Sequence, residues 1–299
     1  MSALNVTDVL EGYSKAIYST WFYYSPDRLL LDAGEGVASR LENRAFAIRK
    51  ICLSHGHLDH ISGLPTLLNI RSAGMGEKTK PLEILYPEGD RYVEGLKMHL
   101  DRAMGRMTYA LSWVPLVPGA RIPLNSDEDD GPGRQHARFL ETFETRHGRN
   151  RTLGYRVVEN RRRLRPDFTG KPQEEIRALV QAGGRDAITE EYAHRLLCYL
   201  GDGVPINVEP FADADILMHE ATFLAEADRE NYVHSTLDEA VAQAVAARAK
   251  NLVLFHFSSR YPRREMRRAI LRALKDHGFD PARAWLVYER HWDNAASLS

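Results

Sequence analysis

Short apolar segments alternate with amphipathic ones along most of the chain. Runs of apolar residues that stop at glycine, proline or a charged residue are typical of buried strands in layered α/β proteins. Such runs occupy residues 27–36, 48–53, 81–87, 196–203, 214–223, 251–259 and 283–290. Apolar residues at helical spacing predict helices at 88–105, 236–250 and 263–278. The pattern therefore predicts an α/β protein.

The middle of the chain has a different pattern. Segments rich in β-branched and aromatic residues, which predict strands or hairpins, occur at 112–117, 121–124, 137–147 and 152–160. From Arg161 to about Arg195 the sequence becomes polar and charged, and we expect one helix there, from Gln173 to Gln181. The sequence thus predicts a single domain over residues 1–299 with an inserted, arm-like segment at 159–196.

Composition narrows the kind of molecule. The 299 residues are 43% hydrophobic, enough for a sizeable core, and the formal net charge of -1 gives no overall positive field. Any binding of nucleic acid must therefore be local. Cys52 and Cys198 lie in apolar stretches, which predicts two buried, reduced thiols. Neither a secretory leader nor a run of about 18 apolar residues occurs, so we expect a soluble, cytoplasmic protein that does not bind membranes.

Three histidines and an aspartate crowd the segment that follows the apolar run at 48–53. His55, His57, Asp59 and His60 lie within the six residues "HGHLDH". In a strand-to-helix loop, His55 and His57 project from the same side. Asp59 and His60, in the following turn, can face a second point nearby. Imidazole and carboxylate groups are zinc ligands. A lone histidine is usually a surface or core residue, but this cluster predicts a metal site.

Further ligands are expected where other strands end, because neighbouring strand ends converge on one edge of a sheet. His147 closes the run at 137–147, Asp202 follows "LLCYLG", and His256 lies near the end of the run at 251–259. We therefore expect two metal ions bridged by Asp202, with three further ligands each: His55, His57 and His147 for the first, and Asp59, His60 and His256 for the second. Two metals about 3.5–4 Å apart can activate water and clamp the oxygens of a phosphodiester.

The segment "SHGHLDHISGLP" resembles the histidine motif of the metallo-β-lactamase superfamily, and other segments resemble its ribonuclease Z branch. From about Leu29 to Tyr261 they follow the order of that family: "LLLDAGEGV", "RHGRNRTLGYRV", "YLGDG", "LMHEATF", "HSTLDEA" and "LFHFSSRY". The ligand motifs alone indicate only the superfamily. The combination of "HEATF", "HST" and "HFSSRY" is much more specific to the branch.

The resemblance implies a four-layer αβ/βα metallo-β-lactamase sandwich with a short inserted arm, two Zn²⁺ per chain, and a homodimer. It implies that Asp59 also accepts a proton from the attacking water, that His234 protonates the departing oxygen, and that Glu220 orients or charges His234. Arg260 is expected to hold the substrate phosphate with its guanidinium fork. Manganese or iron can occupy similar ligands.

Two departures from the family pattern leave the substrate open. The N-terminal segment holds only Gly12 where the branch has a Gly-rich strand end, and the inserted segment has no Gly-Pro pair. The leading interpretation is a ribonuclease Z-like endonuclease that processes the 3′ end of precursor tRNA. The alternative is a dinuclear-zinc hydrolase of a small phosphodiester, such as a cyclic nucleotide, or of another small ester. A non-catalytic, metal-binding interaction protein is a third interpretation, and it has no need of Glu220 and His234.

Overall fold

The computed structural model describes residues 5–74, 79–105, 107–124, 136–229 and 231–298, and these residues form two sheets flanked by helices. The first sheet has the strand order β1 (Leu10–Lys15), β2 (Ser19–Tyr24), β3 (Leu29–Leu31), β4 (Lys50–Cys52), β5 (Leu82–Pro87), β6 (Leu111–Leu116). The second has the order β14 (His291–Asn294), β13 (Ala284–Tyr288), β12 (Leu252–Phe255), β11 (Ile216–Glu220), β10 (Thr189–Tyr199), β9 (Leu153–Leu164), β8 (Arg138–Glu144), β7 (Arg121–Pro123).

The helices are α1 (Val37–Leu41), α2 (Leu58–Ile61), α3 (Leu64–Gly74), α4 (Arg91–Ala103), α5 (Gln173–Gly183), α6 (Arg185–Ile188), α7 (Leu237–Ala246) and α8 (Arg263–Asp276). The helices predicted at 88–105, 236–250 and 263–278 are confirmed as α4, α7 and α8. In the described part of the chain, none of the helices combines the length and the apolar character needed to cross a membrane.

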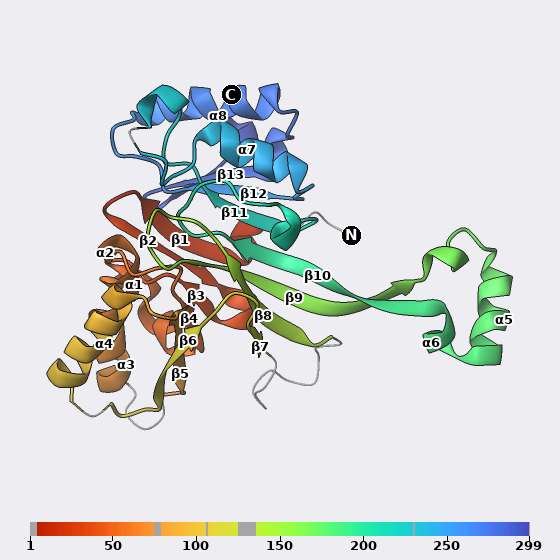
Figure 1. Ribbon diagram of the computed structural model, residues 1–299, viewed down its shortest axis with the longest axis horizontal. Helices are drawn as coiled ribbons and strands as arrows, with labels where there is room; N and C mark the ends of the chain where they lie inside the picture. Colours follow the sequence, from red (N-terminus) through yellow and green to blue (C-terminus); the bar gives the residue numbers. More distant parts are fainter. Residues whose placement is uncertain (1–4, 75–78, 106, 125–135, 230, 299) are drawn as a thin grey trace.

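Side chains on the strands alternate between two layers of the core, as the strand period of two requires. In β11, Ile216 and Met218 pack into the cluster between the two sheets, whereas Leu217 packs with α7 and α8. In β3, Leu31 joins the same intersheet cluster, and Leu30 packs with α1 and α3. Helices therefore cover the outer face of each sheet (Figure 1). The predicted four-layer αβ/βα sandwich is confirmed, and Cys52 and Cys198 are free and buried, as expected.

The hairpin of β1 and β2 was not among the predicted strands. Every residue of β2 is buried, so its sequence "STWFYY" shows no polar and apolar alternation. The turn of this hairpin lies against the second sheet, because the Ala16 N–H donates to the Phe257 carbonyl at 3.2 Å. The N-terminal segment thus closes one side of the sandwich.

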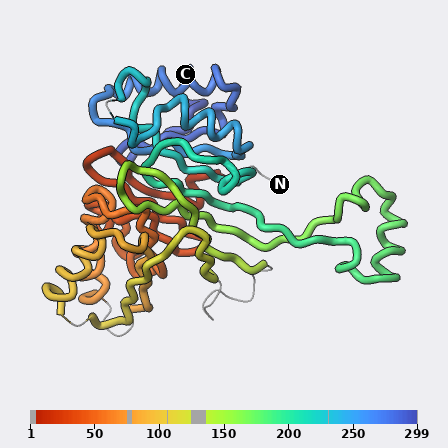
Figure 2. The backbone as a smooth tube through the Cα atoms, viewed as in Figure 1, coloured from red at the N-terminus to blue at the C-terminus, as the bar shows by residue number. Residues whose placement is uncertain are grey.

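An arm projects from the body of the molecule (Figure 1). Strands β9 and β10 continue beyond the sheet as an antiparallel ribbon, paired as far as Leu164 and Thr189, and carry α5 and α6 at the tip (Figure 2). The expected helix at 173–181 is confirmed as α5. The flanking residues are strands, which the polar sequence of this segment does not predict. Because the ribbon lies outside the core, its sequence lacks the apolar alternation of a half-buried strand.

Candidate metal centre

The predicted ligands come together between the two sheets, each in a loop or a short helix that follows a strand. The segment after β4 carries four of them, two in the loop and two in α2, and the loops after β8, β10 and β12 carry one each. They are His55, His57, Asp59, His60, His147, Asp202 and His256. His147 does not close a strand as predicted, because β8 ends three residues earlier, at Glu144.

Two triads with a shared carboxylate make up the cluster. Candidate donor atoms lie within 4.8 Å of one another in each triad: His55, His57 and His147 in the first, and Asp59, His60 and His256 in the second. Asp202 Oδ2 lies 3.2 Å from His60 Nε2 and 3.1 Å from His256 Nε2. Asp202 also forms a donor group with His55 and His60. Two further donor groups include His234: one with His147 and Asp202, and one with Glu220 and His256.

Each histidine of the cluster is oriented by a protein partner on its other nitrogen. The partners are Ser54 Oγ for His55 Nδ1 (3.0 Å), the Asn150 amide for His57 Nε2 (3.1 Å), Asp32 Oδ2 for His60 Nδ1 (2.7 Å), the Val233 carbonyl for His147 Nδ1 (2.7 Å) and Thr222 Oγ1 for His256 Nδ1 (2.9 Å). Such outer partners fix the ring orientation of metal-binding histidines. One nitrogen of each ring is thereby left to face the cluster.

Two buried atoms test whether these residues fit a metal ion. Within the described residues, His55 Nε2 and Asp202 Oδ1 are buried and have no hydrogen-bond partner. Buried polar atoms in native proteins are nearly always paired, and a divalent cation would pair both. An imidazole nitrogen and a carboxylate oxygen are also the donor types that zinc takes. The residues therefore fit a metal ion.

Asp32 was not predicted as a site residue, although it orients the cluster. Its buried carboxylate accepts the Ser54 N–H at 2.6 Å, the Ser54 hydroxyl at 2.8 Å and the Tyr199 hydroxyl, besides facing His60. Asp32 has a φ of 55° and His256 a φ of 60°, in the left-handed region that non-glycine residues rarely adopt. Strain of this kind concentrates at functional sites. Asp32 is the first residue of the motif "DAGEG", and this motif is the sequence feature that could have indicated its role.

The charges of the cluster suit a cation. Burial lowers the pKa of His55 well below its usual value, and the nearby His60 adds to this effect, so His55 is held as the neutral imidazole that binds metals. Burial opposes ionisation of Asp59, but His60 and His256 outweigh it and lower the pKa of Asp59 to about 2. For His60 the carboxylates of Asp202 and Asp32 outweigh burial and raise the pKa. These carboxylates attract positive charge, which a metal ion can supply in place of a proton.

Glu220 and His234 form a pair beside the donor cluster. His234 Nδ1 lies 2.8 Å from Glu220 Oε1, and the His234 ring lies 4.6 Å from the ring of His147 and 5.2 Å from that of His256. The buried Glu220 carboxylate also accepts hydrogen bonds from Thr222 and from the Ser235 N–H. Burial would lower the pKa of His234, but the charge and hydrogen bond of Glu220 outweigh it and raise that pKa to about 9.

Arg260 lies outside the donor cluster. Its guanidinium packs over the ring of Phe223, at 5.4 Å from the centroid, and donates to Ser258 Oγ and to the Asp228 carbonyl, each at 3.2 Å. The Phe223 ring is in turn 6.3 Å from the ring of His234. Phe223 thus contacts both Arg260 and His234 of the Glu220–His234 pair.

The fold and the donor set together define a metal-dependent hydrolase of the metallo-β-lactamase type. Residues 27–182 match the family model described as "Beta-lactamase superfamily domain". The chain is 31% identical over 260 residues to the ribonuclease Z of Halobacterium salinarum, with 79% of each chain covered. It is also 31% identical over 270 residues to the ribonuclease Z of Listeria innocua, with 82% of each covered.

Solved structures agree with these relatives. The short form of human tRNase Z matches with a TM-score of 0.59 and 25% identity, over 84% of this chain and 93% of that one. The metallo-beta-lactamase fold protein YhfI from Bacillus subtilis matches with a TM-score of 0.61 and 18% identity, over 95% of this chain and 98% of that one, a likeness of fold alone. The chain belongs to the ribonuclease Z branch of the metallo-β-lactamase superfamily.

Proposed function

We propose that the chain is a dinuclear-zinc endoribonuclease that processes the 3′ end of precursor tRNA. The observation that carries this function is the Glu220–His234 pair beside the two donor triads, in a chain related to ribonuclease Z along most of its length. A non-catalytic binding protein has no use for such a pair.

The proposed ligand set is that of the two triads and Asp202. His55, His57 and His147 would hold one zinc ion, and Asp59, His60 and His256 the other, with Asp202 shared between them. The bound ions would supply polarisation of the phosphodiester and activation of water at neutral pH. Manganese or iron suits the same nitrogen and oxygen donors.

Asp59 and His234 are the proposed proton carriers. The Ile17 N–H donates to Asp59 Oδ2 at 3.1 Å and holds the carboxylate at the cluster, where it accepts the proton of the attacking water. His234 donates a proton from Nε2 to the departing oxygen, because Nδ1 is engaged by Glu220. Against the effect of burial, Glu220 raises the pKa of His234, which favours the protonated ring. Glu220 is the positioning residue for His234.

The remaining parts of the proposal concern organisation and binding. Arg260 has N–H groups beyond those bound to Ser258 and Asp228, and we assign them to a substrate phosphate. Residues 1–299 would form one domain, with 159–196 as its arm, which the unbroken run of β9 and β10 from sheet to arm supports. By resemblance to the family, we also expect the chain to form a homodimer. We expect this homodimer to act on precursor tRNA in the cytoplasm.

The arm favours a second candidate, a hydrolase of small phosphodiesters. Arg162 pairs with Asp186, Arg163 pairs with Glu190 at 2.8 Å, and Lys171 pairs with Glu175. Backbone binding of a polyanion depends on lysine and arginine side chains that neutralise phosphates. These three are already paired within the arm, whereas the exposed Arg177 and Arg185 of the arm have no ion pair among the described residues.

Parallel assays on metal-analysed protein separate the two candidates. The substrates are a precursor tRNA with a 3′ trailer and a small chromogenic phosphodiester, with His60→Ala as the inactive control. Cleavage at the 3′ end of the acceptor stem establishes the endonuclease. Metal-dependent hydrolysis of the small diester alone would support the second candidate and refute the first.

A further inference from the structure

A groove with two adjoining pockets lies beside the donor cluster. The first pocket, of about 360 Å³, includes Arg91, Tyr92 and Arg149 in its wall. The second, of about 320 Å³, includes Glu88, Glu144 and Thr145. Both walls also contain Gly89, Asn150 and Arg151, so the two pockets form one continuous groove.

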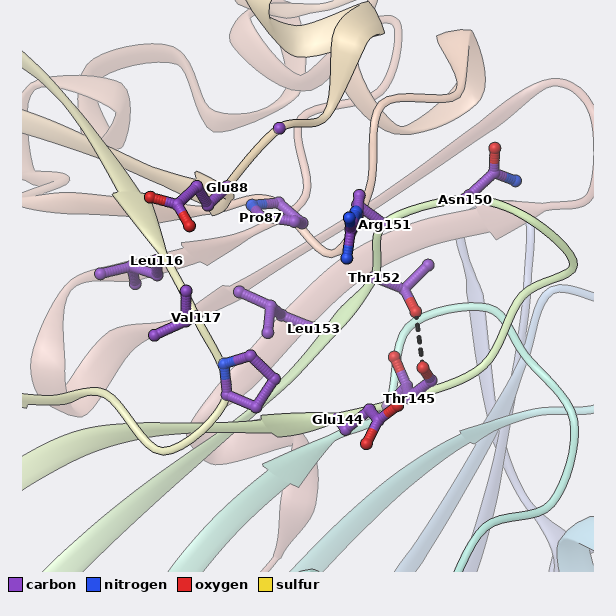
Figure 3. A pocket seen from close by; sticks show the side chains of 12 residues that line it. Pro87, Glu88, Leu116, Val117, Glu144, Thr145, Asn150, Arg151, Thr152 and Leu153 are labelled. Carbon is purple, nitrogen blue, oxygen red and sulfur yellow. Dashed lines mark hydrogen bonds between the residues drawn. The ribbon is translucent and has the colours of Figure 1, made fainter.

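The groove lies next to a proposed metal ligand, His57, which contacts Asn150 of its wall. The Asn150 side-chain amide lies 3.1 Å from His57 Nε2, and the Tyr92 ring lies 6.1 Å from the His57 ring. Figure 3 shows the far pocket, with Glu88, which follows β5, on one side, Glu144 and Thr145 on another, and Arg151 near Pro87 and Thr152. A chain-like substrate cleaved at the metal centre can therefore continue into this groove.

Two arginines of the groove, Arg149 and Arg151, are not ion-paired with any described residue, although Glu88, Asp90 and Glu144 line the same groove. Arg149 and Arg151 are exposed, and in the part of the chain that the structure describes neither side chain makes an ion pair or hydrogen bond. On the neighbouring strands the situation is different. Arg156 pairs with Glu141 at 2.8 Å and Arg138 with Glu159 at 2.7 Å. The loop "HGRNRT" after β8 thus presents two free guanidinium groups, whose planar forks suit phosphate oxygens.

The other groups of the groove suit a nucleobase. The exposed Tyr92 ring carries the Arg91 guanidinium over one face, 4.8 Å from its centroid, and its other face can stack on a base, as aromatic side chains do in proteins that bind single strands. In the far pocket the carboxylates of Glu88 and Glu144 can accept N–H groups of a base edge. Thr145 Oγ1 is buried without a hydrogen-bond partner among the described residues. The pocket volume is at the low end of the range for small-molecule sites, about 300–1,000 Å³, which suits one nucleoside.

We propose that this groove binds the single-stranded ribonucleotides that flank the cleaved bond. Arg149 and Arg151 hold backbone phosphates, Tyr92 stacks one base, and the pocket of Glu88, Glu144 and Thr145 takes the next. The proposal rests on the proposed function, because it assumes an RNA substrate at the metal centre.

The test compares two double variants that remove the same charge. One is Arg149→Ala with Arg151→Ala. The matched control is Arg268→Ala with Arg272→Ala, two exposed residues of α8, which packs on the outer face of the second sheet. The precursor tRNA and the small diester are assayed at several salt concentrations, and kcat/KM is measured for each.

We expect the groove variant to lose roughly 10- to 100-fold more kcat/KM on the precursor than on the small diester. The slope of log kcat/KM against log salt should also fall in magnitude by about 1.4, because two phosphate contacts are lost and each contributes about 0.7 for a single strand. Arg149→Lys with Arg151→Lys should restore most of that slope. The proposal is refuted if the groove variant and the control show the same losses and the same salt slope as each other.

A failure of the proposed function gives a different result. If the unmodified protein hydrolyses the small diester but not the precursor, the endonuclease assignment fails. Fluorescence anisotropy with a labelled single-stranded oligoribonucleotide then tests the groove directly. Binding that the groove variant weakens supports the groove, whereas no binding, or equal binding by both proteins, overturns it.

Discussion

Asp32→Asn tests whether the carboxylate behind the donor cluster controls metal binding. Asn is the appropriate replacement because it has the same shape and tolerates the left-handed backbone at φ 55° better than alanine does. In the native protein, Oδ1 accepts the Ser54 N–H, and Oδ2 faces His60 Nδ1, the Ser54 hydroxyl and the Tyr199 hydroxyl. In either orientation of the asparagine side chain, its NH2 group faces donors from which Asp32 accepts hydrogen bonds in the native protein: the Ser54 N–H in one orientation, and the Ser54 and Tyr199 hydroxyls and His60 in the other. At least one of these hydrogen bonds is therefore lost.

The structure sets the size of the effect. Removing one partner of a buried, hydrogen-bonded charge pair costs about 3–5 kcal/mol, and losing an outer partner of a metal-bound histidine weakens metal affinity about 10- to 100-fold. Tyr199→Phe is the control, because it removes one hydrogen bond to Asp32 without touching His60. It should cost about 1 kcal/mol and change metal affinity little.

Chelator competition gives the metal affinity, and urea unfolding at fixed metal concentration gives the stability. A metal affinity for Asp32→Asn within twofold of the unmodified protein would show that Asp32 does not orient His60. Equal losses of metal affinity in the two variants would point to a general loosening of the core instead.

Three further predictions concern single residues. Asp202→Ala should weaken the binding of both metals, and retention of two metal ions per chain in elemental analysis would contradict the shared ligand. His234→Ala should keep its metal content while turnover falls about 10²- to 10⁴-fold; an unchanged rate would remove His234 from the mechanism. Asp215→Asn addresses pH: hydrogen bonds from His194 and Lys250 outweigh burial and lower the pKa of Asp215. Its contribution is therefore complete at pH 7, about 1 kcal/mol after solvent screening, and the difference in urea midpoint should shrink as the pH falls below about 4.

The donor cluster could be predicted from sequence because its chemistry is local. Four of the candidate ligands lie within six residues, and the others follow strands that the apolar pattern indicates. The outer partners could not be predicted in the same way. Tyr199 reaches Asp32 from the opposite sheet, and Asn150 reaches His57 from the loop after β8. Contacts of this kind depend on how the two sheets face each other, which no local pattern encodes.

The fold was predicted least well where burial is unusual. β2 is buried on both faces and the ribbon of β9 and β10 on neither, so both lack the alternation that marks a half-buried strand. The groove was also missed. Its walls come from the ends of β5 and β6 and from the loop after β8, and nothing in "HGRNRT" indicates that its arginines lack acidic partners.

The division of the candidate ligands between the two sheets has a consequence for the order in which the chain is made. His55, His57, Asp59 and His60 belong to the half of the sandwich that the ribosome completes first, whereas His147, Asp202 and His256 all follow strands of the other half. A nascent chain thus carries four donors long before their partners exist. Neither triad is complete until residue 147 has been added, and the second must wait for residue 256. Binding of a metal ion that needs donors from both halves would therefore be a late event in biosynthesis, because the two halves emerge at different times.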